Sequence, residues 1–222
     1  MQPQQTKTAD TLVVNEVFHS IQGESTWAGW PCVFVRLTAC DMRCRWCDTE
    51  YAFYEGQRRG VDEVTRMVLA YDCPLVELTG GEPLLQEGVY ALMRRLQAAG
   101  RRILVETGGG VAIDRVPEGV HVILDVKCPG SGMQERNVWE NLALLRPGDE
   151  VKFVLSDRRD YEWAQRTVVK HDLARRSTVH FSSAWSRLEP RALAQWILED
   201  HLSVRLNLQI HKWIWGPEAR GV

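Results

Sequence analysis

Three cysteines lie close together on one short segment of the chain. Cys40, Cys44 and Cys47 follow an apolar run, in a stretch that has no helical periodicity. A loop of this length can wrap around one metal centre, and thiolates are soft ligands that suit zinc or iron–sulfur clusters. A closed zinc site needs a fourth ligand, whereas a [4Fe–4S] cluster on three thiolates keeps one iron open for a small molecule. The spacing therefore predicts a metal centre and favours the iron–sulfur cluster over zinc.

A second segment whose residues could bind a ligand follows one β–α unit downstream. Residues 78–83 read LTGGEP and close an apolar run that predicts a strand. Gly80 and Gly81 allow the backbone to approach a ligand, and Glu82 can accept hydrogen bonds from an ammonium group. Alone, the segment could be a turn before a helix. Its position after the cysteine loop favours a ligand-binding role.

The elements that must position these residues alternate between strand-like and helix-like patterns. Several strand candidates, such as VILDV and VKFVL, are nearly continuous apolar runs, which is typical of parallel strands covered on both faces. The helix candidates carry apolar stripes at i, i+3, i+4 and i+7. We predict strands at 12–18, 33–38, 75–79, 102–106, 121–127, 150–155, 178–182 and 204–210, and helices around 61–71, 89–96, 138–146, 159–174 and 190–201.

Repeated β–α units imply right-handed crossovers and a parallel sheet. A complete eightfold barrel needs about 250 residues, and this chain has 222. We therefore predict an α/β fold, an incomplete TIM-like parallel β/α barrel of about six main strands. Residues 1–11 are expected to form a mobile tail and residues 12–222 a single domain. The active site of such a fold lies at the carboxyl ends of its strands.

Composition limits the partners and the compartment. A net charge of −2 and a pI near 6.3 argue against a broad nucleic-acid surface, although local basic residues suffice for a small anion. No run approaches the roughly 20 apolar residues of a membrane helix, and the polar start lacks a signal-peptide core. We expect a cytoplasmic protein, in which clustered cysteines indicate metal binding more than disulfides.

The cysteine spacing C-x₃-C-x₂-C, with the aromatic Trp46 before the last cysteine, resembles the radical S-adenosylmethionine (SAM) superfamily. The LTGGEP segment resembles a second motif of that superfamily. The resemblance implies that the open iron of a [4Fe–4S] cluster binds SAM. An electron then cleaves SAM to methionine and a 5′-deoxyadenosyl radical.

Further segments resemble the 7-carboxy-7-deazaguanine synthase family over residues 12–216. They include SIQGE at 20–24, CDT at 47–49 and LQIHK at 208–212. The resemblance implies ring contraction of 6-carboxy-5,6,7,8-tetrahydropterin to 7-carboxy-7-deazaguanine, with release of ammonia, in queuosine and deazapurine biosynthesis. It also implies Mg²⁺, a homodimer and a flavodoxin- or ferredoxin-type electron donor.

The same resemblance assigns roles to individual residues. Cys40, Cys44 and Cys47 would hold the cluster, and Thr49 would contact Mg²⁺. Residues expected to bind SAM are Trp46, Asp48, Gly80, Gly81, Glu82, Asp125, Val126, Lys127 and Ser131. Residues expected to bind the pterin are Ile21, Gln22, Gly23, Arg36, Thr79 and His211, the last at the end of the final strand. A buried arginine needs an anionic partner, so Arg36 could serve the substrate carboxylate or a structural ion pair.

Some features depart from this pattern or stay open. Gly108 stands where the family motif has asparagine, which puts one local contact in doubt. Cys32, Cys73 and Cys128 are expected not to bind the cluster, and the part played by residues 216–222 is open. Two alternatives remain: a glycyl-radical-enzyme activase with the same cofactors, and a zinc-stabilised binding module without catalysis.

Overall fold

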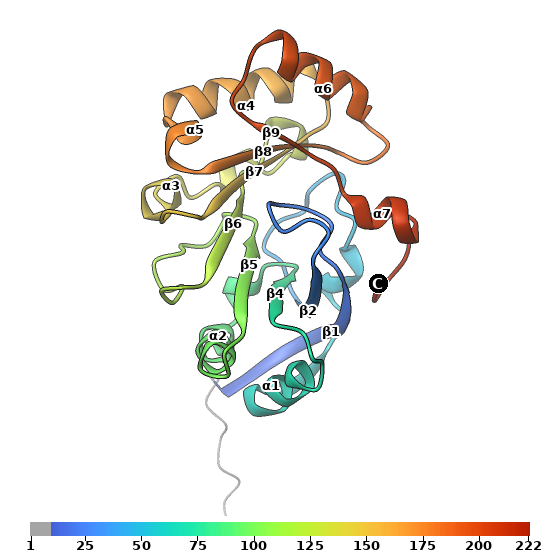
Figure 1. Ribbon diagram of the computed structural model, residues 1–222, viewed down its shortest axis with the longest axis vertical. Coiled ribbons are helices and arrows are strands. Elements are labelled where there is room, and N and C mark those ends of the chain that lie inside the picture. Colours follow the sequence, from blue (N-terminus) through green and yellow to red (C-terminus); the bar gives the residue numbers. More distant parts are fainter. Residues whose placement is uncertain (1–9) are drawn as a thin grey trace, which may run out of the picture.

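A computed structural model describes residues 10–222, and its strands form one continuous sheet in the order β3-β1-β2-β4-β5-β6-β7-β8-β9 (Figure 1). From β2 onward each strand pairs in parallel with the next, whereas β1 pairs antiparallel with β2 and β3. This confirms the predicted incomplete barrel, with six longer parallel strands and a short β9. The strands are β1 (Thr11–Ile21), β2 (Pro31–Leu37), β3 (Gln57–Gly60), β4 (Leu75–Gly80), β5 (Arg102–Thr107), β6 (His121–Asp125), β7 (Glu150–Leu155), β8 (Thr178–Ser183) and β9 (Arg205–Asn207).

The helices cover the outside of the curved sheet. In Figure 1, α1 and α2 lie at the lower end, α4, α5 and α6 lie at the upper end, and α7 stands at the right near the C-terminus. The helices are α1 (Val61–Leu69), α2 (Gly88–Ala98), α3 (Asn141–Leu144), α4 (Arg158–Lys170), α5 (Leu173–Arg176), α6 (Pro190–Glu199) and α7 (Ile210–Trp215).

Helix α2 shows how the sequence pattern sets the packing. Its stripe residues Val89, Leu92, Met93 and Leu96 are completely buried, as the helical spacing predicts. After the helix ends, Gly100 adopts a φ of +77°, a conformation that favours glycine and stops the helix. The chain then enters β5, so that α2 packs against the strand that follows it.

The strand predicted over 204–210 is wrong beyond Asn207. The edge strand β9 has only three residues, and the amide of Ile210 donates to the carbonyl of Gly23 at 3.0 Å instead of extending the sheet. The chain turns there into α7. His211 therefore lies on a helix and not at the end of a strand.

Other boundaries differ for local reasons. The helix expected at 138–146 is a four-residue turn, α3. The helix expected at 159–174 divides into α4 and α5 at Asp172, whose φ is +50°. Strand β3 was missed because its sequence, QRRG, lacks apolar alternation. The tail predicted over 1–11 falls largely outside the described residues, and β1 already begins at Thr11.

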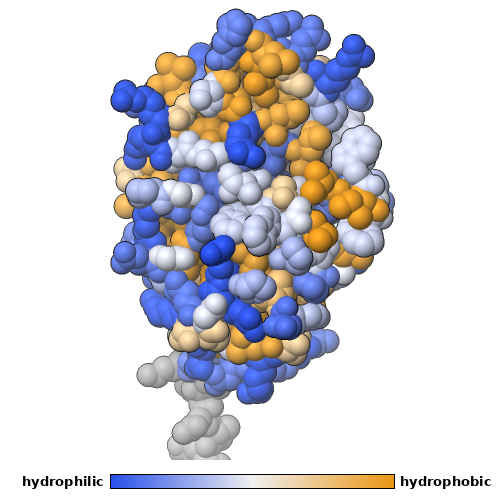
Figure 2. Space-filling model, viewed as in Figure 1, coloured by the Kyte–Doolittle hydropathy of each residue, from blue (hydrophilic) through white to orange (hydrophobic). Residues whose placement is uncertain are grey.

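The surface mixes hydrophilic and hydrophobic groups. Figure 2 shows hydrophobic groups on the upper part of this face, around α4 and α6, and at the right, beside α7. Exposed apolar residues of these helices include Val169, Leu198 and Ile214. Within residues 10–222, no helix has the length and apolar character needed to cross a membrane.

Candidate active site

A cavity of about 620 Å³ lies where the carboxyl ends of the parallel strands meet. Its wall includes Arg36 from β2, Thr79 and Gly80 from β4, Thr107 from β5 and Asp125 from β6. Each residue is the last or near-last of its strand. The cavity therefore occupies the place predicted for the active site, and its size is ordinary for a small-molecule site.

The cysteine loop forms one side of this cavity. Cys40, Cys44 and Cys47 all line it as free, half-buried thiols. The amide of Cys47 donates to the carbonyl of Cys44 at 3.2 Å, which folds the loop into a tight turn. Burial raises the pKa of Cys44 to about 11. The free thiol is therefore protonated at neutral pH, and binding of a metal must displace that proton.

The cysteine loop packs closely against the end of β4 because Gly80 and the following Gly81 have no side chain. A Cβ on Gly81 would lie 2.1 Å from the carbonyl oxygen of Ala39 and 3.0 Å from Cβ of Cys40. Gly80 adopts a φ of +137° and also lies against the backbone of Leu37. Nowhere in residues 10–222 do three or more His, Cys, Asp or Glu side chains converge on one ion. Three soft thiolates spread along the cavity wall suit a cluster, which is larger than a single ion.

Asp125 and Lys127 form a buried ion pair beside the cysteines. Lys127 Nζ lies 2.9 Å from Asp125 Oδ2. Burial disfavours the ammonium cation, but Asp125 outweighs this and raises the pKa of Lys127. Asp125 Oδ1 is buried and has no hydrogen-bond partner among the described residues. An unpaired buried acceptor is costly, so this oxygen indicates a ligand that supplies a donor.

Glu82 does not reach the cavity, contrary to the expectation that it contacts an ammonium group. Its buried carboxylate accepts hydrogen bonds from Leu84 N, Thr107 Oγ1 and Gly108 N at 2.8–3.0 Å. These bonds tie the end of β4 to the end of β5. Of the other residues expected at the SAM site, Val126 and Ser131 also lie outside the cavity wall, because Val126 is in the core and Ser131 Oγ donates to the carbonyl of Cys128.

Gly108, where an asparagine was expected, keeps its loop in place through the backbone. Its amide donates to Glu82 Oε2 at 2.8 Å. A Cβ there would meet Lys127 at 3.4 Å and Met42 at 3.5 Å, which is ordinary contact. The packing therefore does not demand glycine at this position.

Arg36 and Thr79 are neighbours in the register of β2 and β4, and both line the cavity. Arg36 Nε donates to Glu16 at 2.7 Å, so a structural ion pair is present. Within the described residues, its two terminal nitrogens make no hydrogen bond. Burial disfavours the guanidinium cation, but Tyr51, Glu16 and Asp48 outweigh it and raise the pKa of Arg36. Arg36 therefore retains both its charge and donors for an anionic ligand.

The end of β1 and the loop after it form the opposite wall. Ile21, Gln22 and Gly23 line the cavity together with His211. A Cβ on Gly23 would lie 1.9 Å from Nδ1 of His211, so glycine is required for α7 to pack here. Gln22 Nε2 donates to Glu77 of β4. Burial, aided by the nearby carboxylate of Glu106, raises the pKa of Glu77 to about 8.

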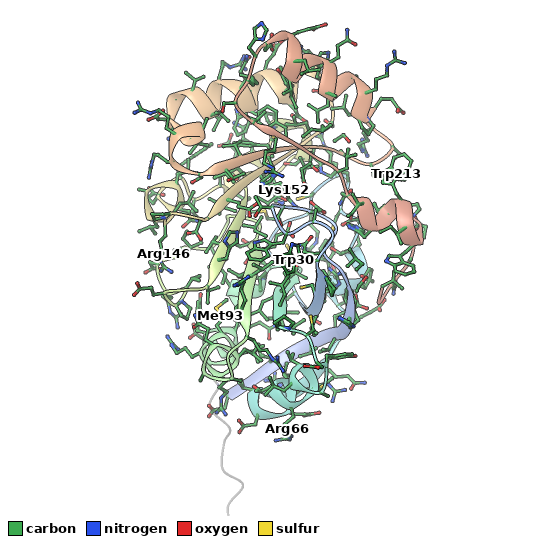
Figure 3. The ribbon with its side chains drawn as sticks, in the orientation of Figure 1. Trp30, Arg66, Met93, Arg146, Lys152 and Trp213 are labelled. Atoms are coloured by element: carbon green, nitrogen blue, oxygen red, sulfur yellow. The ribbon has the colours of Figure 1, made fainter. Side chains whose placement is uncertain are left out.

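A buried lysine at the base of the cavity was not anticipated. Figure 3 shows Lys152 near the centre of the molecule, and its Nζ lies 2.8 Å from Glu24, pairs with Glu106 and lies 3.8 Å from Asp125. Burial disfavours the cation, but these carboxylates outweigh it and raise the pKa of Lys152. Against the effect of burial, Lys152 and His211 lower the pKa of Glu24 to about 2. The sequence feature that could have predicted this lysine is a charged residue inside an apolar strand run, EVKFVL at residues 150–155.

Helix α7 is fastened to the cysteine loop. Lys212 Nζ donates to Asp48 at 2.6 Å and to Gln209 at 2.8 Å. Burial opposes ionisation of Asp48, but Lys212 outweighs it and lowers the pKa of Asp48. Thr49 also lines the cavity, and its Oγ1 lies 3.7 Å from Cys47 Sγ. The predicted Trp46 and residues 216–222 also line the cavity.

Comparisons with known proteins agree with this geometry. Residues 35–128 match the model of the radical SAM superfamily. A protein of Chlorobaculum tepidum named 7-carboxy-7-deazaguanine synthase is 47% identical over 97% of this chain and 99% of its own length. A protein of Koribacter versatilis with the same name is 47% identical over 95% of this chain and 100% of its own. These relatives do not favour either the activase or the zinc-module alternative.

Solved structures show the same fold at low sequence identity. The crystal structure of QueE from Escherichia coli superposes with a TM-score of 0.76 and 20% identity, over 90% of this chain and 94% of that one. Streptococcus suis SuiB bound to S-adenosylmethionine superposes with a TM-score of 0.55 and 9% identity, over 77% of this chain and 48% of that one.

Proposed function

This chain belongs to the 7-carboxy-7-deazaguanine synthase family, and from that premise we propose how its cavity carries out the reaction. The enzyme converts 6-carboxy-5,6,7,8-tetrahydropterin to 7-carboxy-7-deazaguanine by radical SAM ring contraction, with release of ammonia. The observation that carries the proposal is that the cysteine loop, the polar residues of the loop after β1, and the polar residues of β2, β4 and β7 open into one cavity.

Cys40, Cys44 and Cys47 hold the [4Fe–4S] cluster. When bound, the cluster supplies the electron that cleaves SAM. Gly80 and Gly81 would let the backbone approach SAM, and the unpaired Asp125 Oδ1 would accept a hydrogen bond from it. Lys127 holds Asp125 in position through their ion pair. Trp46 and Asp48 border the same part of the cavity. Glu82 acts indirectly, by holding the ends of β4 and β5 together.

The pterin occupies the opposite part of the cavity. Arg36 binds its carboxylate with the two terminal nitrogens that Glu16 leaves free. Gln22, Thr79 and His211 line the wall with groups that hydrogen-bond a heteroaromatic edge. Ile21 and Gly23 shape the same wall. The carboxylates around Lys152 supply acceptors for the ring N–H groups.

Mg²⁺ prefers oxygen ligands and keeps few protein contacts. Thr49 Oγ1, beside Cys47 and one residue from Asp48, is the oxygen that would hold it next to the substrate carboxylate. The partners we propose are a flavodoxin- or ferredoxin-type donor and a second copy of this chain in a homodimer.

An anaerobic turnover assay tests the function. Reconstituted protein would be mixed with dithionite, SAM, Mg²⁺ and 6-carboxytetrahydropterin, and products followed by mass spectrometry. We expect 7-carboxy-7-deazaguanine. Cleavage of SAM with intact pterin would overturn the substrate assignment, and an intact cluster without SAM cleavage would overturn the radical SAM assignment.

A further inference from the structure

Glu77 is a buried acid to which the proposed reaction gives no role. It lies inside the apolar run of β4, in the middle of the sheet (Figure 1), and is 2% exposed. Side chains alternate along a strand, so Glu77 and Thr79 share the face of β4 that lines the cavity. Val76 and Leu78 pack in the hydrophobic core instead. A buried carboxyl is costly unless it is hydrogen-bonded, so the partner of Glu77 indicates its role.

That partner is Gln22, in the loop after β1. Gln22 Nε2 donates to Glu77 Oε2, and both residues line the cavity. Strand β2 lies between β1 and β4 in the sheet. The hydrogen bond therefore joins the loop after β1 to β4 across the inner face of the sheet. It connects a residue of the pterin wall to a residue that has no other function in the cavity.

The remaining polar groups of Gln22 are fixed as well. Its Oε1 accepts from the amide of Glu24 at 2.5 Å. Its backbone amide donates to the carbonyl of Trp30 at 2.8 Å, and its carbonyl accepts from the amide of Gly29 at 2.8 Å. A side-chain amide has two N–H donors and one carbonyl acceptor. Because Glu77 uses one of these donors, the second N–H of Nε2 is the donor that Gln22 can offer to a ligand.

Glu77 suits this role because it is a neutral acceptor at neutral pH. Burial, together with Glu106 and Glu24, outweighs the opposing effects of Gln22 and Lys152 and raises the pKa of Glu77 to about 8. The protonated carboxyl adds no negative charge to the base of the cavity, and its carbonyl oxygen can still accept from Gln22. A glutamine at position 77 would offer a similar acceptor, whereas a methionine would fill the space without one.

We propose that Glu77 is a positioning residue that holds the amide of Gln22 so that one N–H points at an acceptor atom of the pterin ring. The inference rests on the proposed function, which places Gln22 in the pterin wall. The atoms this donor can recognise are a ring carbonyl oxygen or a ring nitrogen without hydrogen. The substrate has both, in its C4 carbonyl and N1. Glu77 itself acts through Gln22 and takes part in no bond that forms or breaks.

A double-mutant cycle in the reconstituted holoenzyme tests the proposal. Its variants are Glu77→Met, Gln22→Ala and the two together. Glu77→Gln is the conservative variant. Val76→Ala is the control, because Val76 is the preceding residue of β4, is fully buried and does not line the cavity. The probe is 6-carboxypterin, the oxidised form of the ring, and its Kd would be measured by calorimetry without reductant, so that no turnover occurs. The Kd of SAM, and kcat and KM for 6-carboxytetrahydropterin with dithionite, would be measured alongside.

We expect Glu77→Met to weaken binding of 6-carboxypterin about tenfold, as the loss of one buried hydrogen bond implies. Its KM for the substrate should rise to a similar extent, with smaller changes in kcat and in the Kd of SAM. Glu77→Gln should stay within about twofold of wild type. Gln22→Ala should weaken pterin binding in the wild-type background and add little to the loss in Glu77→Met. Val76→Ala should lower the melting temperature through its cavity and leave pterin binding unchanged.

Three results would overturn the proposal. The first is wild-type affinity of Glu77→Met for 6-carboxypterin. The second is full additivity of Glu77→Met and Gln22→Ala, which would show that Glu77 does not act through Gln22. The third is an equal loss in Glu77→Met and Glu77→Gln, or equal weakening of pterin and SAM binding, since neither is expected from the loss of one acceptor for Gln22.

If Glu77→Met does not fold, Glu77→Asp decides, because it keeps the carboxyl and withdraws it by one methylene group. Weaker binding of 6-carboxypterin with unchanged binding of SAM would then support the proposal, and wild-type binding of both would contradict it. Absence of product from the wild-type protein with dithionite would contradict the proposed function. The binding cycle with 6-carboxypterin needs no turnover, so it tests the role of Glu77 separately.

Discussion

Two buried polar clusters lie two residues apart on β7 and are built in opposite ways. The Glu150 cluster is closed: His121 Nε2 lies 2.8 Å and His180 Nε2 2.5 Å from its carboxylate, and Thr26 N donates to it at 3.1 Å. None of these residues lines the cavity. The Lys152 cluster, formed by Lys152, Glu24, Glu106 and Asp125, has more carboxylates than cations and opens onto the cavity.

The Glu150 cluster buries charge to stabilise the fold, whereas the Lys152 cluster buries charge where a ligand can use it. In the Glu150 cluster every carboxylate oxygen has a donor, so the charge fastens the loop after β1 to the sheet. In the Lys152 cluster Asp125 Oδ1 lacks a partner among the described residues, and the pKa of Glu77 nearby is raised to about 8. Unpaired acceptors and perturbed carboxyls in a cavity are typical of a ligand site.

The largest expected effect comes from removing the cluster ligands. Replacement of Cys40, Cys44 and Cys47 together by alanine should abolish product formation and the brown colour of the reconstituted protein. The closed cluster and the core do not involve these thiols, so the melting temperature of the apoprotein should change little. Visible absorbance, iron content and calorimetry would check this, and retention of the iron–sulfur cluster would contradict the ligand assignment.

The next largest effect falls on stability. Glu150→Gln leaves His121, His180 and Thr26 with an incomplete acceptor, which should cost about 3 kcal/mol and lower the melting temperature by roughly 10 °C. Turnover at 15 °C, where the variant is still folded, should stay within about twofold of wild type. The exposed Glu118→Gln is the control and should stay within about 0.5 kcal/mol. A wild-type melting temperature for Glu150→Gln would show that the cluster does not stabilise the fold.

A smaller effect is expected at the proposed metal ligand. Thr49→Ala should raise the Mg²⁺ concentration needed for half-maximal activity about tenfold, because one oxygen ligand is lost. Its affinity for SAM should stay near wild type, and Thr49→Ser should behave as wild type in both respects. Equal loss of Mg²⁺ response and SAM binding in Thr49→Ala would show that Thr49 supports the loop and does not bind the ion.

The smallest effect concerns pH. The pKa of Glu77 rises from 4.5 to about 8 on folding. Between these values the folded protein binds a proton that the unfolded protein releases, so this group makes stability fall as pH rises from about 5 to 8. Glu77→Gln should make the fall in melting temperature of the apoprotein shallower by a few degrees. Parallel curves for Glu77→Gln and wild type would contradict the raised pKa.

The sequence predicted which strand ends line the cavity better than it predicted the buried Lys152 cluster. Apolar strand runs located the parallel strands, and strand ends located Arg36, Thr79 and the LTGGEP glycines at one cavity. The pattern could not predict that Lys152 meets Glu24, which is 128 residues away in sequence. Such a pair depends on which strands face one another across the barrel, and periodicity reports only that a position is buried.

Local context explains two further differences. Sequence does not reveal that Thr107 and Gly108 donate hydrogen bonds to the carboxylate of Glu82. His211 was expected on a strand because LQI is apolar, but an edge strand ends when its last amides find partners elsewhere, as Ile210 does at Gly23.

The most direct measurement compares turnover of Lys152→Met with that of Glu150→Gln at 15 °C, with folding of each verified by near-ultraviolet circular dichroism. Because Lys152→Met leaves buried carboxylates without their cation at the base of the cavity, we predict a loss of about 100-fold in kcat/KM for the pterin, which corresponds to about 3 kcal/mol. Glu150→Gln should retain its activity. Wild-type turnover by folded Lys152→Met, or its collapse in folded Glu150→Gln, would contradict the division between an open functional cluster and a closed structural one.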